Sequence, residues 1–236
     1  LRLSRGLGDV YKRQIQRAAD DAGNPEIGEQ PAAAQLHWVE IEPEADYFDE
    51  AQAMAAAAWG SLKCAEKVGF PNFRGLHWPG RMHEVVQASS GQRWLLEGAH
   101  NPSGMETSCR TLERDERWKN PWALLFGSTP QSEMGAMLEP LVNLCRRHPP
   151  VAIVLTEPQF GRYPGVPCTE LASELARHDL HISASFANPQ EAVAWVEAQS
   201  STLTDVLCIG SLYLAGNVLQ ALGADDDEAL SIVAKD

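Results

Sequence analysis

The sequence predicts an α/β domain in which a mixed, mostly parallel sheet is flanked by helices. From residue 83 onwards, short apolar segments alternate with segments of helical character. Segments that are apolar throughout are typical of strands buried on both faces, which helices must then cover. In sheets of this kind, ligands bind beyond the carboxyl ends of the strands.

The expected elements follow one another closely, as in a Rossmann-like domain. Strands 83–88 and 93–98, joined by a Ser-Ser-Gly-Gln turn, predict a hairpin. Further strands are expected at 122–126, 151–155, 181–185 and 205–209. Helices are expected at 103–115, 131–148, 169–178, 189–199 and 212–222.

The residues before this domain hold too few apolar segments to build a core of their own. They predict the end of a helix over 15–23, a strand over 36–41 and an alanine-rich helix over 48–67. We therefore expect three parts: a carboxyl-terminal remnant of a larger domain (15–76), a separate domain (77–224) and an acidic tail (225–236).

The chain begins at Leu1 without a methionine, so we expect a fragment. Residues 1–14 are basic, whereas the rest of the chain is acidic, and they resemble a translated sequencing adapter. We expect this segment to be non-native, and the fold prediction leaves it out.

Composition narrows the classes of function. The net charge of -13 argues against a nucleic-acid partner, because phosphate binding needs clustered Lys and Arg. No stretch of about 18 apolar residues is present, so no membrane span is expected. The five cysteines are scattered and the seven histidines lack metal-ligand spacing. This pattern predicts reduced thiols, a cytoplasmic location and no metal site of the chain's own. We expect a monomer.

Three strings place polar residues where such a sheet binds ligands. In the first, Trp78-Pro-Gly-Arg81, Pro79 and Gly80 form a stiff turn. The turn can present the Arg81 guanidinium to a phosphate or ribose oxygen. The alternative is a surface arginine on a linker between domains, and this string alone favours the linker.

The second string, Glu97-Gly-Ala-His-Asn-Pro-Ser103, follows a buried strand and leads into a helix. Glu97 falls at the carboxyl end of the strand. Asn101 or Ser103 can cap the helix, whose amino-terminal amides attract an anion. The alternative is purely structural: Asn101 and Ser103 would only cap the helix, and His100 would only pack. Four polar residues within seven positions favour a ligand site instead.

The third string, Gly210-Ser-Leu-Tyr213, again joins a buried strand to a helix. Ser211 can cap that helix or offer its hydroxyl to a ligand, and this string alone favours a plain cap. The sequence contains no GxxxxGK[ST], GxGxxG or GxSxG motif. The chain alone is therefore not expected to hold ATP with magnesium.

Together, these strings resemble the signature of the folylpolyglutamate synthase/dihydrofolate synthase family, within the Mur ligase superfamily. The matching residues are Trp78-Pro-Gly-Arg81, Gly98-Ala-His-Asn-Pro102 and Gly210-Ser-Leu-Tyr-Leu-Ala-Gly216. Phe126-Gly-Ser128 and Leu155-Thr-Glu-Pro158 fall at strand ends where the family has similar segments. The resemblance implies a Mur ligase C-terminal domain, preceded by the tail of a truncated ATP-binding domain.

By that resemblance, the whole protein would be an ATP-dependent, ADP-forming ligase. It would join L-glutamate to dihydropteroate or a folate through an acyl phosphate, with ATP and Mg²⁺ as cofactors. The phosphate loop and the magnesium ligands would lie in the amino-terminal domain, so the fragment would be inactive alone. Catalysis would come from positioning as the two domains close.

The resemblance also implies residue roles. Arg81 and Glu97 would contact the nucleotide. The glutamate or substrate contacts would come from His100, Asn101, Ser103 and Ser211. No catalytic residue is assigned to this chain.

The sequence departs from the family pattern at two positions. The acid before Gly-Ala-His is usually Asp but is Glu97 here, which is one methylene longer. The Asn-Ala pair that opens the family's alanine-rich helix is replaced by Glu50-Ala51, which removes the expected adenine contact. Two alternatives therefore stay open: another Mur-type amino-acid ligase, and a non-catalytic Rossmann-like binding module.

Overall fold

The computed structural model describes residues 38–42, 45, 47–61, 78–115, 121–226 and 230. The chain divides into two units, Leu1–Phe73 and Arg74–Asp236. The described part of the first unit contains one helix, α2 (Tyr47–Gly60). This helix confirms the alanine-rich prediction as far as Gly60, and residues 62–67 lie outside the described residues.

The strand predicted over 36–41 is wrong in its described part, because residues 38–41 form no strand. A strand needs a neighbour to pair its backbone N–H and C=O groups, and the described part of the first unit offers none. Residues 36 and 37 and the helix predicted over 15–23 lie outside the described residues.

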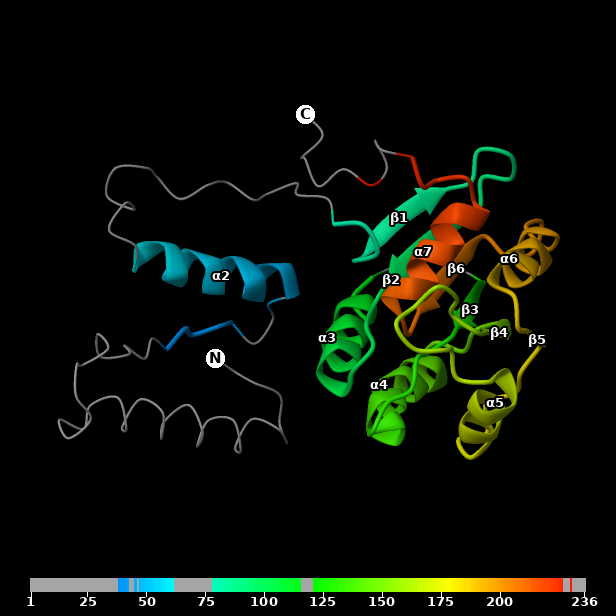
Figure 1. Ribbon diagram of the computed structural model, residues 1–236, viewed down its shortest axis with the longest axis horizontal. Helices are drawn as coiled ribbons and strands as arrows, with labels where there is room; N and C mark the ends of the chain where they lie inside the picture. The colour runs from blue at the N-terminus through cyan, green and yellow to red at the C-terminus, as the bar shows by residue number, and fades with distance from the viewer. Residues whose placement is uncertain are drawn as a thin grey trace. The chain divides into compact units, whose positions relative to one another are not determined.

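The second unit is a six-stranded sheet with the strand order β1-β2-β6-β3-β4-β5. Its strands are β1 (His83–Val86), β2 (Arg93–Glu97), β3 (Trp122–Phe126), β4 (Ala152–Thr156), β5 (Ala184–Phe186) and β6 (Asp205–Ile209). β1 runs antiparallel to β2, and the other pairs are parallel. The predicted mixed, mostly parallel sheet is confirmed (Figure 1).

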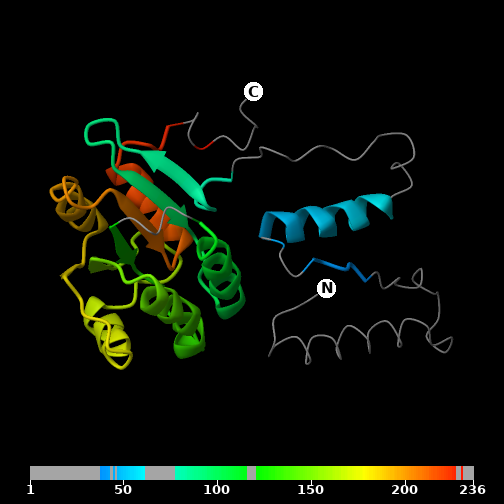
Figure 2. The same ribbon diagram turned by 180° about the vertical axis from the view of Figure 1, so that it is seen from behind.

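The helices cover both faces of this sheet, as the sequence predicts. They are α3 (Pro102–Leu112), α4 (Met134–Arg147), α5 (Cys168–Ala176), α6 (Pro189–Glu197) and α7 (Leu212–Ala221). α3, α4 and α5 pack on one face, and α6 and α7 on the other (Figures 1 and 2). Along β2 the side chains alternate between the two cores, with Leu95 in the first and Leu96 in the second.

Two further predictions can be compared with the structure. Strand β5 begins at Ala184, three residues later than the predicted start at 181. It is an edge strand that pairs only with Val154–Thr156 of β4, so the partner sets its length. The described cysteines Cys109, Cys145, Cys168 and Cys208 are free and buried, as predicted. Cys64 lies outside the described residues.

The topology brings the polar strings to one edge of the sheet. β2 and β6 are parallel neighbours, with Glu97 opposite Ile209, so the segments that follow them leave at the same edge. The helix after β6 covers one face, whereas the helices after β2 and β3 cover the other. Such a switch point is where ligands bind in open α/β sheets.

Gly210, directly after β6, provides a test of how closely the loops meet at this edge. It has a φ of 118°, and a Cβ there would lie 2.5 Å from the carbonyl oxygen of Gly127. We expect Gly210→Ala to lower the free energy of unfolding by about 2–4 kcal/mol, because backbone strain and a backbone clash add. Chemical denaturation measures the loss.

Gly223→Ala is the matched control. Gly223 is also left-handed, with φ 65°, but a Cβ there would meet nothing within 4 Å. It should cost roughly 1–2 kcal/mol from backbone strain alone. Equal losses at the two positions would contradict the close approach at Gly210.

Candidate functional site

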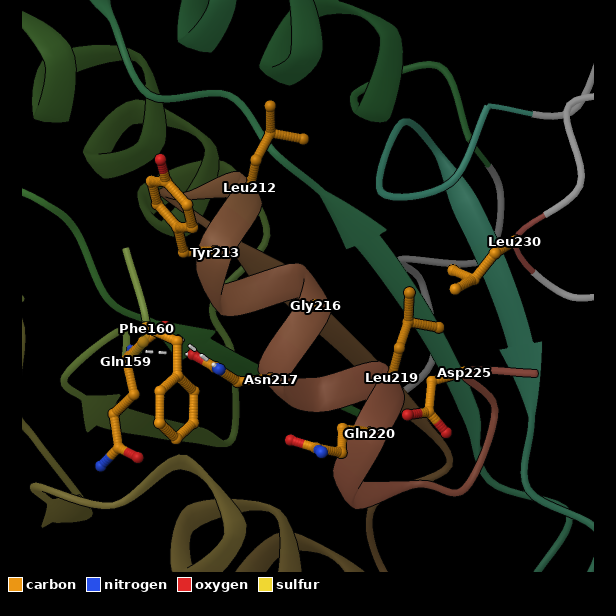
Figure 3. A pocket seen from close by; sticks show the side chains of 10 residues that line it. All are labelled: Gln159, Phe160, Leu212, Tyr213, Gly216, Asn217, Leu219, Gln220, Asp225 and Leu230. Atoms are coloured by element: carbon orange, nitrogen blue, oxygen red, sulfur yellow. Dashed lines mark hydrogen bonds between the residues drawn. The ribbon is translucent and has the colours of Figure 1, made fainter. Parts of the chain in front are cut away.

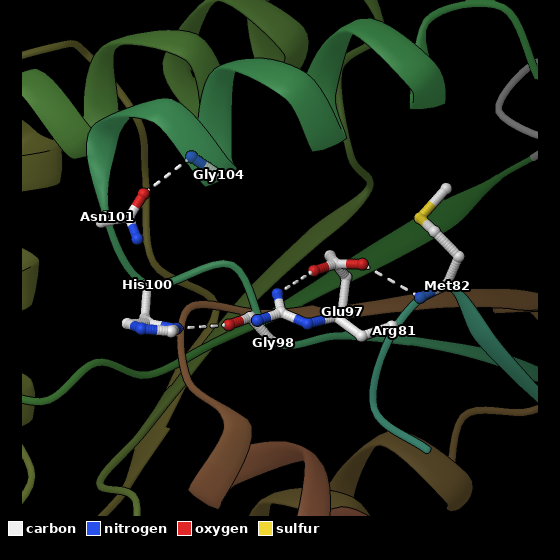
Figure 4. A network of polar contacts seen from close by, with 7 residues as sticks. All are labelled: Arg81, Met82, Glu97, Gly98, His100, Asn101 and Gly104. Atoms are coloured by element: carbon white, nitrogen blue, oxygen red, sulfur yellow. Dashed lines mark hydrogen bonds and ion pairs between the residues drawn. The ribbon is translucent and has the colours of Figure 1, made fainter. Parts of the chain in front are cut away.

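Glu97 ends β2 with its carboxylate buried, since its side chain is only 1% exposed. One carboxylate oxygen accepts a hydrogen bond from Nη1 of Arg81 at 2.9 Å, which is also an ion pair. The other accepts from the backbone N–H of Met82, again at 2.9 Å (Figure 4). Both oxygens of Glu97 are therefore bound by neighbouring residues of one turn.

The turn over 78–82 is wound so that it can make both bonds. The backbone N–H of Arg81 donates to the carbonyl oxygen of Trp78 at 3.0 Å, and Gly80 has a φ of 73°. Met82 is also left-handed, at φ 42°, a conformation that costs roughly 1–2 kcal/mol for a residue with a side chain. The predicted stiff turn before Arg81 is confirmed, and the bond from Met82 to Glu97 offsets part of its strain.

Burial and hydrogen bonding have opposite effects on the charge of Glu97. Loss of solvent raises the pKa of Glu97 above its ordinary value of 4.5, because burial disfavours the charged form. The Met82 N–H and the Arg81 guanidinium act in the opposite direction and lower this pKa, but the effect of burial is larger. The ionised carboxylate therefore depends on both partners.

His100 lies beside this turn and is fixed by a backbone carbonyl. Its Nδ1 lies 2.8 Å from the carbonyl oxygen of Gly98 (Figure 4). A carbonyl oxygen only accepts, so we infer that Nδ1 carries a proton. The Nε2 atom of the neutral ring is then an acceptor. His100 can accept from an amine or, when protonated, donate to a carboxylate.

The two capping candidates of the second string are now distinguished. Asn101 caps α3, because its Oδ1 accepts from the N–H of Gly104 at 2.8 Å. Ser103 lies inside the first turn of α3, half-buried, and does not cap it. The Asn101 side-chain amide N–H groups remain available at the exposed end of the helix.

Ser211 caps α7 and is buried. Its hydroxyl accepts from the backbone N–H of Tyr213 at 3.1 Å, as the third string predicted. It forms no hydrogen bond with the other five predicted site residues, all of which the structure describes, but its neighbour Leu212 lies against the glycines next to two of them. A Cβ on Gly98 would lie 2.2 Å from Cδ2 of Leu212, and a Cβ on Gly80 would lie 3.4 Å from the same atom. The three strings therefore meet at one corner of the sheet edge.

A second set of contacts at this edge was not predicted from the sequence. Asn217 of α7 binds both backbone groups of Gln159, accepting from its N–H at 2.8 Å and donating to its carbonyl at 3.3 Å. A shallow pocket of about 350 Å³ lies over α7 beside this contact (Figure 3). An asparagine inside a helical segment gave no signal, because side chains of this type usually face solvent.

The fold is an α/β domain with a mixed, mostly parallel sheet, and its three polar strings meet at the carboxyl edge of that sheet. A family model described as "Dihydrofolate synthetase, C-terminal domain" matches residues 83–221, and the chain belongs to this family. The family resemblance predicted from the three strings is confirmed.

Two solved structures of E. coli FolC share the fold. E. coli FolC in complex with ADP, without folate substrate, is 19% identical with a TM-score of 0.52; the match covers 82% of this chain and 43% of that one. E. coli FolC in complex with DHPP and ADP is 20% identical with a TM-score of 0.51, and the match covers 82% of this chain and 42% of that one. Folylpolyglutamate synthase from Thermotoga maritima is 22% identical with a TM-score of 0.49, covering 64% and 32%. The chain thus spans less than half the length of each. No curated protein sequence matches it.

The described residues contain neither a membrane-spanning helix nor a metal-binding cluster. None of their helices combines the length and the apolar character needed to cross a membrane. None of their His, Cys, Asp and Glu side chains form a group of three that could hold a metal ion.

Glu97→Gln tests the balance at the buried carboxylate. A carboxyl whose pKa is raised on folding binds more protons in the folded state, so its contribution to stability is lost as the pH rises through that pKa. We expect the unfolding free energy of the wild type, relative to Glu97→Gln, to fall as the pH rises above 4.5. Denaturation over a pH series measures the difference. Glu106→Gln, at an exposed position of α3, is the control, and a difference that grows with pH would contradict the burial effect.

Proposed function

We propose that the whole protein is an ATP-dependent, ADP-forming ligase that adds L-glutamate to dihydropteroate or a folate. Membership of the dihydrofolate synthetase C-terminal family supports this proposal. The observation that carries it is Arg81, which a stiff turn and the buried Glu97 hold at the switch point of the sheet.

The proposed reaction has two steps. A carboxylate oxygen of the acid substrate attacks the terminal phosphorus of ATP, and the bond to ADP breaks to give an acyl phosphate. The amino nitrogen of L-glutamate then attacks the acyl carbon, the bond to phosphate breaks, and the nitrogen loses a proton as the amide forms. Both steps move negative charge between oxygen atoms, so held cations and N–H donors favour them.

On the nucleotide side, we assign the contact to Arg81. Its side chain is 27% exposed, and only Nη1 is bonded to Glu97, so the rest of the guanidinium fork can reach a phosphate or ribose oxygen. Glu97 acts through Arg81, because its own oxygens are buried and already bound. The departure from Asp to Glu thus leaves a carboxylate that is long enough to reach both partners.

On the amino-acid side, we assign His100, Asn101, Ser103 and Ser211. The Nε2 of His100 can accept from the amino group of the incoming glutamate, and the amide of Asn101 can donate to a carboxylate. Ser103 lies in the first turn of α3, where free backbone N–H groups favour an anion. Ser211 has a hydroxyl proton to donate while it caps α7.

Magnesium would accompany ATP in this proposal. The described residues offer no cluster for it, so we assign no magnesium ligand to this chain. The proposal places the ion with the triphosphate and the residues of the amino-terminal domain.

The activity is tested on the protein in its full natural length, by measuring ADP release with dihydropteroate or a folate, with and without L-glutamate. We expect release that depends on both the acid and the amino acid. Release that ignores both substrates, or none at all, would contradict the proposal.

Arg81→Lys tests the nucleotide contact separately from stability. Lysine keeps a cation for Glu97 but loses the fork, so KM for ATP should rise about tenfold while the unfolding free energy changes little. Arg146→Lys, at the exposed end of α4 on the opposite edge, is the control. An unchanged KM for ATP in Arg81→Lys would remove Arg81 from the nucleotide site.

A further inference from the structure

The described arginines divide unevenly between the two edges of the sheet. Arg81 and Arg162 lie at the carboxyl edge, where β2, β4 and β6 end. The others lie at strand starts or helix ends on the opposite edge: Arg93, Arg110, Arg114, Arg146, Arg147 and Arg177. The edge that should meet anionic ligands therefore has two described cations.

These two cations differ in how their charge is used. Arg81 is paired with the buried carboxylate of Glu97 at 2.9 Å. Arg162 is exposed, and no carboxylate in the described part of the chain forms an ion pair with it. Its guanidinium carbon lies 5.6 Å from the centre of the Tyr163 ring, a contact that orients the group without neutralising it.

The loop that carries Arg162 is held firmly on α7. Asn217 binds both backbone groups of Gln159, and Phe160 is fixed in a left-handed conformation at φ 61° (Figure 3). Gly161 packs closely against the ring of Tyr213: a Cβ on Gly161 would lie only 2.8 Å from Cδ2 of that ring. A strained, exposed loop with this much support is typical of a functional segment.

The same contacts connect Arg162 to the corner described above. The ring of Tyr213 supports Gly161, and the backbone N–H of Tyr213 donates to Ser211 at 3.1 Å. Ser211 is one of the residues that we assign to the amino-acid side. The guanidinium of Arg162 is thus presented from a loop that packs on the same helix end.

We propose that Arg162 binds a carboxylate of the amino-acid substrate, L-glutamate. This inference rests on the proposed function and adds a residue that determines specificity for the amino acid. L-glutamate carries two carboxylates, and a cation that no carboxylate already neutralises attracts them to the place where the substrate binds. The planar fork of an arginine makes paired, charge-assisted hydrogen bonds to a carboxylate.

Steady-state kinetics of the full-length protein tests this assignment. Arg162→Gln should raise KM for L-glutamate at least tenfold, and Arg162→Lys should have an intermediate effect, because lysine keeps the charge without the fork. KM for ATP should stay unchanged in both. Arg177→Gln, an exposed arginine at the opposite end of α5, should leave KM for L-glutamate unchanged.

The outcomes separate the two proposals. An active wild type in which Arg162→Gln leaves KM for L-glutamate unchanged would overturn the assignment of Arg162 while the proposed function stands. An inactive wild type would overturn the proposed function. Arg162 is then decided by NMR of the 236-residue chain titrated with L-glutamate. A shift of the Arg162 Nε–H signal that Arg162→Gln abolishes would support carboxylate binding, and no shift would overturn it.

Discussion

The carboxylate of Glu97 has to be both buried and hydrogen-bonded, and the corner of the site is arranged around this requirement. Removing an ionised carboxylate from water costs several kcal/mol unless other groups replace the lost hydration. The replacements are the Arg81 guanidinium and the Met82 N–H, each at 2.9 Å. Both come from one turn, which the antiparallel pairing of His83 with Leu96 places opposite the end of β2. The hairpin, the left-handed turn and the ion pair therefore depend on one another.

This arrangement also explains how a small domain can present ligand-binding groups. A free arginine loses side-chain entropy when it binds a ligand, and a held arginine has already lost most of it. At this edge, Arg81 is held by a buried acid, whereas Arg162 is held by a supported loop and an aromatic ring. The antiparallel pairing of β1 with β2 brings the turn with Arg81 to this edge, and the parallel order of β2, β6, β3 and β4 brings the loop with Arg162 there. A common edge for these segments follows from the topology of the sheet.

The sequence could predict what depends on local pattern. β3 is apolar throughout, β6 is apolar after Asp205, and both occupy the expected residues. Ser211 caps α7 as its position indicated. It could not choose between Asn101 and Ser103, since both residue types cap helices. It also missed the partners of Glu97 and the Asn217 contact, because these join residues that are 15, 16 and 58 positions apart. Such contacts depend on strand register and packing, which composition and periodicity do not contain.

The most direct test is the coupling between Arg81 and Glu97. A double-mutant cycle with Arg81→Met, Glu97→Gln and the double variant, followed by chemical denaturation, measures this coupling without reference to any ligand. If each partner depends on the other, the double variant should lose less stability than the sum of the single losses, by about 1 kcal/mol or more. Additive losses would show that the two side chains act independently and would contradict the account of the corner.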